Sequence, residues 1–287
     1  MHIQWYPGHM AKAKRLLAEQ LKAVDVILEI RDARIPFSSA NQDLIALAQY
    51  KPRIIILNKV DLCDLDRLIP WEKKFKETAF AVIRTDSLQR KGIKEVMQAV
   101  HLAGKEIMAK RVAKGLLPRP VRAMVIGIPN VGKSSFINAM VKRGSTRTGN
   151  KPGVTKGNQW VRLLSNIELM DTPGILWPRF EDPQIGEYLA FTGAISERIF
   201  NIEEAADRLI DFLRTHYPLT LNRVYGVQHL DRENHYILEE IGSSCRFLDK
   251  KGEIEMERTS LKLLHDFQTS KMGCFTLDDP PTLEEHA

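Results

Sequence analysis

The chain has 287 residues, of which 44% are apolar and 27% are charged, and its net charge is +6 at pH 7. This length is enough for one large domain and one smaller domain, and the basic balance favours contact with polyanions such as RNA. The three cysteines, Cys63, Cys245 and Cys274, lie far apart and form no CxxC pair. Their spacing argues against a zinc site or a disulfide framework and fits a reducing cytosol.

The N-terminal sequence MHIQWYPGHMAKAKR lacks the apolar segment of a signal peptide. No apolar run in the chain approaches the ~18 residues that a membrane-spanning helix needs. We therefore expect a cytoplasmic protein without a membrane partner.

The first two thirds of the chain alternate short apolar runs with helical patterns. The apolar runs predict strands buried on both faces, at residues 24–30, 53–57, 81–85, 121–127 and 167–171. Helices are predicted between them, at residues 41–49, 92–115 and 134–143. Residues 158–164 closely precede the last strand, so the two could pair as a hairpin. This alternation predicts an α/β fold with a mostly parallel sheet and helices on both faces.

The strand pattern fades after about residue 180. Amphipathic helices are predicted at residues 203–218, 233–248 and 258–273, and an acidic tail with prolines follows them. We expect an α/β domain over residues 1–182 and a small all-α domain over residues 183–287, which includes the tail.

A phosphate-binding loop is predicted at residues 127–134, GIPNVGKS, which follow a predicted strand and open a helix. The sequence matches G-x-x-x-x-G-K-[ST], in which glycines let backbone N–H groups surround phosphate oxygens. Lys133 would reach the β- and γ-phosphates, and Ser134 would bind Mg²⁺. The residues expected to contact the nucleotide here are Pro129, Asn130, Val131, Gly132, Lys133, Ser134 and Ser135.

A second phosphate-side element is DTPG at residues 171–174, which ends the strand predicted at 167–171. Asp171 lies where a carboxylate holds Mg²⁺ directly or through water, and the Gly174 N–H can contact the γ-phosphate. Thr155, in PGVTKG, is the candidate switch threonine that would complete the Mg²⁺ shell when the γ-phosphate is present. Taken alone, DTPG also fits an ordinary strand-end turn, and Thr155 an ordinary turn threonine.

The base-reading element is NKVD at residues 58–61, directly after the strand predicted at 53–57. The Asp61 carboxylate can accept two hydrogen bonds from the guanine N1–H and N2 amino group, which adenine does not offer. Asn58 would anchor the base edge and the neighbouring loops, and the Lys59 stem would cover the ring. Polar contacts of this kind reject a base that lacks the matching groups, so together with the phosphate loop they predict GTP and GDP over ATP.

A base-support loop is expected after the next strand, where many GTPases carry Ser-Ala-Lys. Thr85, Asp86 and Ser87 occupy that place here. The usual contact is a backbone N–H to guanine O6, so the identity of the side chains matters little.

The motifs stand in an unusual order, because NKVD lies 69 residues before Gly127. Their cyclic order is intact, which predicts a circularly permuted P-loop GTPase domain, a rearrangement that a compact domain tolerates when its original termini lie close together. The DTPG strand is then the last of the sheet, so the loop that senses the γ-phosphate leads directly into the helical domain. This connection predicts a two-state switch.

This motif order, the N-terminal WYPGHM and the closing DFQTSKMG resemble the circularly permuted family of bacterial ribosome biogenesis GTPase A, over residues 1 to about 280. The resemblance implies a cytoplasmic GTPase that binds the immature large (50S) ribosomal subunit in its GTP state. It would contact rRNA and ribosomal proteins through both domains, promote a late assembly step and leave after hydrolysis. We expect it to act as a monomer, with residues 183–287 as an RNA- or ribosome-binding domain.

The residue after Gly174 is Ile175, where Ras-like enzymes carry a glutamine that orients the attacking water. His9 is a candidate replacement, because histidine donates or accepts hydrogen bonds near neutral pH; the resemblance matches it to a histidine implicated in hydrolysis. From the sequence alone, His9 could equally be a packed or solvated residue. Asn130 could bind K⁺ beside the phosphates and supply positive charge there, or could be chosen for its turn geometry.

A different class of function also fits, namely an RNA-binding module that is gated by guanine nucleotide and hydrolyses GTP only incidentally. Residues 105–122 carry six basic residues and one acid. They could form an RNA-facing helix or a solvated helix face with a linker. Stimulation of GTP turnover by large ribosomal subunits would separate the two functions.

Overall fold

The computed structural model describes residues 8–48, 50–144, 160–163, 166–171 and 182–281, and gives only the backbone for 8–14, 43–44, 142–144 and 171. The chain divides into two compact units. The sheet unit contains Tyr6–Pro178 together with Thr276–Ala287, and the helical unit contains Arg179–Phe275.

The sheet unit is built on six strands in the order β3-β2-β1-β4-β6-β5. The neighbouring strands are parallel except for β5 and β6, which pair antiparallel as the expected hairpin. All six predicted strands are confirmed, with small shifts of their ends. Their bounds are β1 (Val26–Asp32), β2 (Arg53–Asn58), β3 (Ala81–Arg84), β4 (Val121–Ile126), β5 (Trp160–Leu163) and β6 (Ile167–Asp171).

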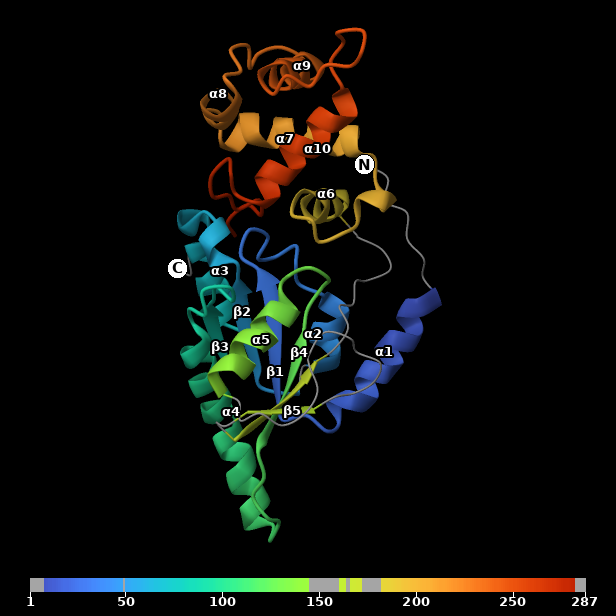
Figure 1. The fold of residues 1–287 in the computed structure, drawn as a ribbon. Coiled ribbons are helices and arrows are strands. Elements are labelled where there is room, and N and C mark those ends of the chain that lie inside the picture. The colour runs from blue at the N-terminus through green and yellow to red at the C-terminus, as the bar shows by residue number, and fades with distance from the viewer. Residues whose placement is uncertain (1–7, 49, 145–159, 164–165, 172–181, 282–287) are drawn as a thin grey trace. The chain divides into compact units, whose positions relative to one another are not determined.

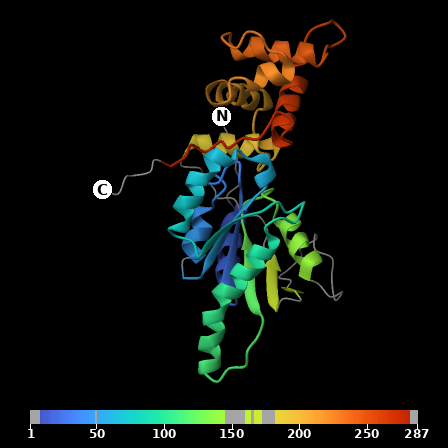
Figure 2. The ribbon, with the colours of Figure 1, turned by 90° about the vertical axis from the view of Figure 1, so that its left-hand side faces the viewer.

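Helices cover both faces of this sheet (Figures 1 and 2). On one face, Leu17 and Leu21 of the first helix pack against Ile27 and Met124 of the central strands. The third helix packs on the same face, over β2 and β3, and the fourth and fifth helices cover the opposite face. The bounds are α1 (Gly8–Leu21), α2 (Gln42–Ala48), η1 (Val60–Leu62), α3 (Leu65–Lys76), α4 (Ile93–Ala113) and α5 (Lys133–Gly144).

The central strand β1 is buried along its whole length, as expected for a parallel strand covered by helices on both faces. The chain leaves β1 toward β2 on one side, whereas β4 lies on the other side. In open parallel sheets a crevice forms outside the carboxyl ends of the strands at such a reversal of strand order. The loops after β1, β2, β3 and β4 therefore meet at one edge of the sheet.

The described part of the helical unit contains the three helices predicted from the sequence, two further α-helices and one short 3₁₀ helix. Apolar residues such as Leu209, Leu213, Ile241 and Leu263 form its core. Pro183 occupies the first turn of the first helix, whose preceding Asp182 accepts a hydrogen bond from the backbone N–H of Gln184 at 2.8 Å. The bounds are α6 (Pro183–Phe191), η2 (Glu197–Ile199), α7 (Ile202–His216), α8 (Thr220–Tyr225), α9 (Asn234–Ser244) and α10 (Met256–Gln268).

Helix α1 begins at Gly8, so His9 and Met10 belong to its first turn. The segment from Thr276 onward belongs to the sheet unit, not to the helical domain in which the expected boundary 183–287 placed it. Its buried hydrogen bonds, described below, account for this. Among the described residues, no helix is both long and apolar enough to cross a membrane.

Candidate nucleotide-binding site

The P-loop, residues 127–132, lies between β4 and α5 and has an unusual backbone. Gly127 and Gly132 have φ of +153° and +97°. A Cβ on Gly132 would lie 2.4 Å from the Asn58 Nδ2, and one on Gly127 would lie 2.5 Å from the Ile30 carbonyl oxygen. Asn130 also has a positive φ, of 58°. The loop is therefore packed so tightly onto β1 and β2 that its two glycines leave no room for side chains.

Lys133 begins helix α5 and folds back over the P-loop. Its Nζ donates to the carbonyl oxygens of Gly127, at 3.1 Å, and Ile128, at 2.6 Å. The residue is only 8% exposed. The ammonium group thus lies at the start of the loop, beside the N-terminus of α5, where positive charge and free N–H groups favour an anion.

Asn58, the last residue of β2, joins three loops. Its Nδ2 donates to the Val131 carbonyl oxygen of the P-loop at 2.9 Å. Its Oδ1 accepts from the hydroxyls of Thr85, at 3.1 Å, and Ser87, at 2.7 Å. The residue is 2% exposed. The side chain therefore fixes the phosphate-binding loop, the NKVD loop and the base-support loop relative to one another.

Lys59 links the NKVD loop to the P-loop and to the end of β1. Its Nζ donates to the Asn130 carbonyl oxygen at 2.7 Å and forms an ion pair with the Asp32 Oδ2 at 2.9 Å. Asp32 is also held by Arg34, whose Nε and Nη2 lie 3.0 and 2.8 Å from its two carboxylate oxygens. Burial alone would raise the pKa of Asp32, but Arg34 and Lys59 outweigh it and hold that pKa well below its ordinary value.

The other predicted base-side residues lie close by. Asp61 is an exposed residue of η1, and partial burial, opposed by a backbone hydrogen bond, raises the pKa of its carboxyl above the ordinary value. Asp86 is buried, and its Oδ1 accepts from the backbone N–H groups of Leu88 and Gln89, both at 3.0 Å. The Asp86 side chain therefore closes its own loop. The backbone N–H groups of Thr85, Asp86 and Ser87 donate to the Leu57 carbonyl oxygen, the Lys91 carbonyl oxygen and the Asn58 Oδ1.

The residues proposed for Mg²⁺ belong to helix α5, which follows β4 and the P-loop, and to β6, which pairs with β4. The Ser134 side chain is exposed in the first turn of α5, and Asp171 ends β6, opposite Val125 of β4. Mg²⁺ bound to a nucleotide keeps waters and phosphate oxygens and needs only one or two protein ligands, so this donor set fits. The described residues contain no group of three or more His, Cys, Asp or Glu that could hold a metal ion.

The side chains of four predicted residues cannot be placed in this geometry. Thr155 and Gly174 lie outside the described residues, and only the backbone is described for His9, in the first turn of α1, and for Asp171. The roles predicted for these four residues, like those of the other site residues, stay predictions.

The sequence analysis missed Asp32 and Arg34. Both are buried, with exposed fractions of 2% and 1%. The available signal was RDARIP at residues 31–36, a run of charges that begins at the carboxyl end of the buried strand β1. Such charges at the carboxyl end of a buried strand indicate a paired or functional group rather than a solvated loop.

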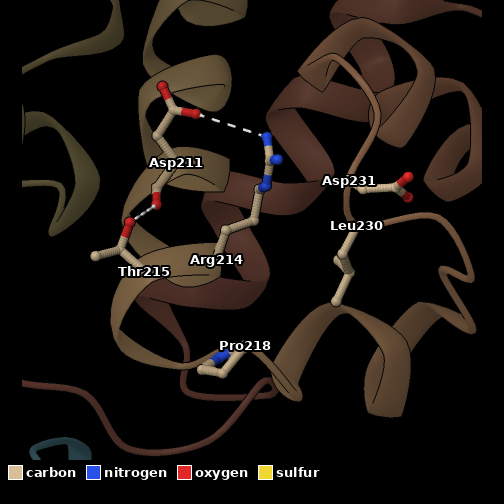
Figure 3. A pocket seen from close by; sticks show the side chains of 6 residues that line it. All are labelled: Asp211, Arg214, Thr215, Pro218, Leu230 and Asp231. Atoms are coloured by element: carbon tan, nitrogen blue, oxygen red, sulfur yellow. Dashed lines mark hydrogen bonds and ion pairs between the residues drawn. The ribbon is translucent and has the colours of Figure 1, made fainter.

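A separate pocket of about 630 Å³ lies in the helical unit (Figure 3). Arg214 on its wall donates to the Asn234 Oδ1 at 2.9 Å and lies 4.0 Å from the Asp211 Oδ1. With two carboxylates and one guanidinium, the wall has no excess of positive charge for a phosphate. Its lining residues are Asp211, Arg214, Thr215, Pro218, Leu230 and Asp231.

Comparison with known proteins identifies the family. Residues 122–245 match the family model described as "50S ribosome-binding GTPase". Ribosome biogenesis GTPase A of Bacillus cereus is 41% identical over 286 residues, which cover 99% of this chain and 96% of that protein. The chain belongs to the ribosome biogenesis GTPase A family.

More distant matches agree with this family. Mitochondrial ribosome-associated GTPase 1 of Mus musculus is 34% identical over 238 residues, which cover 79% of this chain and 70% of that protein. The crystal structure of GNP-bound YlqF from T. maritima has a TM-score of 0.66 at 24% identity and covers 94% of this chain and 98% of that chain. The solved structure shows a shared fold.

Family membership confirms several predictions. The chain is a circularly permuted P-loop GTPase with a mostly parallel sheet and a helical C-terminal region, it binds GTP and GDP, and it hydrolyses GTP. The residues that perform each step are argued below as proposals.

Proposed function

We propose that this ribosome biogenesis GTPase binds the immature large ribosomal subunit in its GTP state, promotes a late assembly step and leaves after hydrolysis. The main support is the name carried by relatives that match almost the whole chain, together with the ribosome-binding description of the family model. We propose that the protein acts in the cytoplasm as a monomer.

In the proposed mechanism, the P-loop N–H groups and Lys133 bind the phosphates. Mg²⁺, when bound, offsets the charge on the β- and γ-phosphates. Ser134 and Asp171 would hold that ion, and Thr155 would join them only while the γ-phosphate is present. Lys133 is well placed for its role, because its ammonium group already lies against the P-loop carbonyl oxygens.

Guanine would be read by the NKVD loop. The exposed carboxylate of Asp61 would accept from the base edge, and the Lys59 stem would cover the ring while its ammonium stays paired with Asp32 at 2.9 Å. The loop of Thr85, Asp86 and Ser87, which is fixed to Asn58, would line the base pocket. This arrangement favours guanine, because adenine lacks the N1–H and N2 amino group from which the Asp61 carboxylate would accept hydrogen bonds.

Hydrolysis needs a group that orients water, because Ile175 cannot do so. We propose that His9 supplies this group on the ribosomal particle and that K⁺ held by Asn130 adds positive charge beside the phosphates. The positive φ of Asn130 and its exposed side chain support a position at the rim of the P-loop.

A basic projection of the sheet unit is a candidate contact for rRNA. The buried residues of α4 end at Gly104, so its last nine residues, 105–113, contribute nothing to the core. Together with the following loop they form the α4 arm, residues 105–119, which extends beyond the sheet (Figure 1). At the tip, the Leu116 N–H donates to the Arg111 carbonyl oxygen at 3.1 Å and closes the turn.

The charge of the α4 arm favours an anionic polymer as its partner. Its sequence has five basic residues and one acid. Each phosphate contact makes binding fall more steeply with salt. We expect Lys105→Ala/Lys114→Ala to weaken binding to ribosomal particles and to flatten its salt dependence. The matched control is Lys73→Ala/Lys76→Ala on α3, which removes the same charge elsewhere. If both double variants bind ribosomal particles with the same affinity and the same salt dependence, the α4 arm is not a contact for rRNA.

Co-sedimentation with ribosomal particles tests the proposed partner. The protein, loaded with a non-hydrolysable GTP analogue or with GDP, is centrifuged with immature large subunits and, separately, with small subunits. We expect it to pellet with the large-subunit precursor in the GTP-analogue state and to stay in solution in the GDP state. Equal pelleting with both subunits, or in both nucleotide states, would contradict the proposal.

A further inference from the structure

The chain returns to the sheet unit after it has formed the helical unit. We call residues 276–278 the C-terminal strap. The Leu277 N–H donates to the Arg34 carbonyl oxygen at 2.7 Å, and the Thr276 hydroxyl donates to the Asp64 carbonyl oxygen at 3.0 Å. The Arg67 Nε donates to the Thr276 carbonyl oxygen at 2.9 Å. The strap therefore bridges the loop after β1 and the start of α3, which are the segments on either side of β2.

Asp278 is the central contact of this strap. It is 4% exposed, and its Oδ2 accepts from the backbone N–H groups of Phe37, at 2.6 Å, and Ser38, at 3.0 Å. Its Oδ1 accepts from the Ser38 hydroxyl. A buried carboxylate needs partners of this number to offset its lost hydration. The loop at residues 33–40 thus closes around one side chain that comes from the far end of the chain.

The same loop holds the group that orients Lys59. The backbone N–H of Arg34 donates to the Asp32 Oδ1 at 3.1 Å, and the Arg34 guanidinium donates to both carboxylate oxygens of Asp32. Asp32 in turn pairs with Lys59, whose Nζ reaches the P-loop at the Asn130 carbonyl oxygen. A continuous series of contacts therefore leads from Asp278 through loop 33–40 to the NKVD loop.

We propose that Asp278 is a positioning residue for guanine-nucleotide binding. By fixing loop 33–40 it keeps Arg34 and Asp32 in place, and these keep the Lys59 stem where it covers the base. The proposal rests on the role proposed above for Lys59. Release of the strap would loosen that lysine and speed nucleotide dissociation; by linkage, bound nucleotide would hold the strap in place.

The strap is one of the two chain segments that join the units, so the Asp278 contact could regulate nucleotide binding. The helical unit is joined to the sheet unit at both of its ends, through the segment after β6 and through the strap. The first connection follows the DTPG loop, and the second ends beside the NKVD loop. A partner that displaces the strap would therefore act on the guanine side of the site, independently of the γ-phosphate side.

The test compares GDP release from four variants of the full chain. We expect Asp278→Ala to release a fluorescent GDP analogue about tenfold faster than the wild type, a typical size for a coupled site. Asp279→Ala is the matched control, because Asp279 is exposed and its loss removes only a surface ion pair with Arg67. We expect it to release GDP within about twofold of the wild-type rate.

A double-mutant cycle separates positioning from general loosening of the fold. In a Lys59→Ala background, Asp278→Ala should add little, because the lysine through which it acts is absent. The same tenfold effect in that background, or equal release from Asp278→Ala and Asp279→Ala, would overturn the proposal. If Asp278→Ala does not fold, Ser38→Ala, which removes one of the three donors, replaces it with the same expected order of effects. The assay contains no ribosomal particle, so its result is independent of the proposed ribosomal partner.

Discussion

The glycine at position 132 offers a sharp test of the nucleotide site. An alanine there must adopt φ near +97°, and its Cβ would lie 2.4 Å from the Asn58 Nδ2. The backbone strain costs about 1–3 kcal/mol. Displacing Asn58 would break its 2.9 Å bond to Val131 and leave buried polar groups unpaired, at a further cost of about 1–3 kcal/mol. We therefore expect Gly132→Ala to weaken GDP binding by about 10²- to 10³-fold.

Gly115 provides a matched control for that substitution. It also has a positive φ, of +73°, but a Cβ added to it would meet nothing within 4 Å. Gly115→Ala should cost only the local strain, about 1–2 kcal/mol at the end of α4, and leave GDP binding unchanged. Binding is measured by titration with a fluorescent GDP analogue, alongside thermal unfolding of each variant. Equal GDP affinities for the two variants would refute the packing argument.

Three further predictions follow from the site and its surroundings. Burial raises the pKa of Asp278 to about 6, above its ordinary 3.8. The stability that the protonated carboxyl contributes, up to about 3 kcal/mol, is therefore complete below pH 3.8 and is lost as the pH rises through 6. Urea unfolding from pH 4 to 7.5 should show this loss in the wild type and not in Asp278→Asn, and parallel curves would contradict it. GTP turnover should be faster in K⁺ than in Na⁺ if Asn130 helps to hold K⁺, and equal rates would remove that role. His9→Ala should keep normal GDP affinity but lose most particle-stimulated turnover, and a normal stimulated rate would exclude His9 from hydrolysis.

Much of the fold and of the nucleotide site could be predicted from the sequence, because each motif follows an apolar run. GIPNVGKS follows β4, and NKVD begins at the last residue of β2. Because both strands are short, buried and parallel, both loops are predicted at the edge of the sheet formed by the carboxyl ends of the strands. The intact cyclic order of the motifs then predicts the permuted sheet. A local pattern of this kind therefore predicts both a strand and the ligand group that the loop after it binds.

Other parts depend on contacts that no local pattern reveals. Asp278 lies 240 positions from Ser38 in the chain, and an acidic tail with prolines has the composition of a solvated segment. Only the folded chain shows that this carboxyl is buried and that the tail belongs to the sheet unit. Asp32 and Arg34 escaped prediction for a related reason, because a buried ion pair and a solvated charged turn have the same residue types.

The central proposal, that this chain is a GTPase acting on the large ribosomal subunit, is tested most directly by its turnover on that particle. GTP hydrolysis by the wild type is measured alone, with immature large subunits and with small subunits, and Lys133→Ala corrects for contaminating activity. We expect immature large subunits to raise the rate about tenfold or more, as a partner does when it completes a catalytic site, and small subunits to leave it unchanged. A rate that large subunits do not change would contradict the proposal and favour an RNA-binding module with incidental hydrolysis.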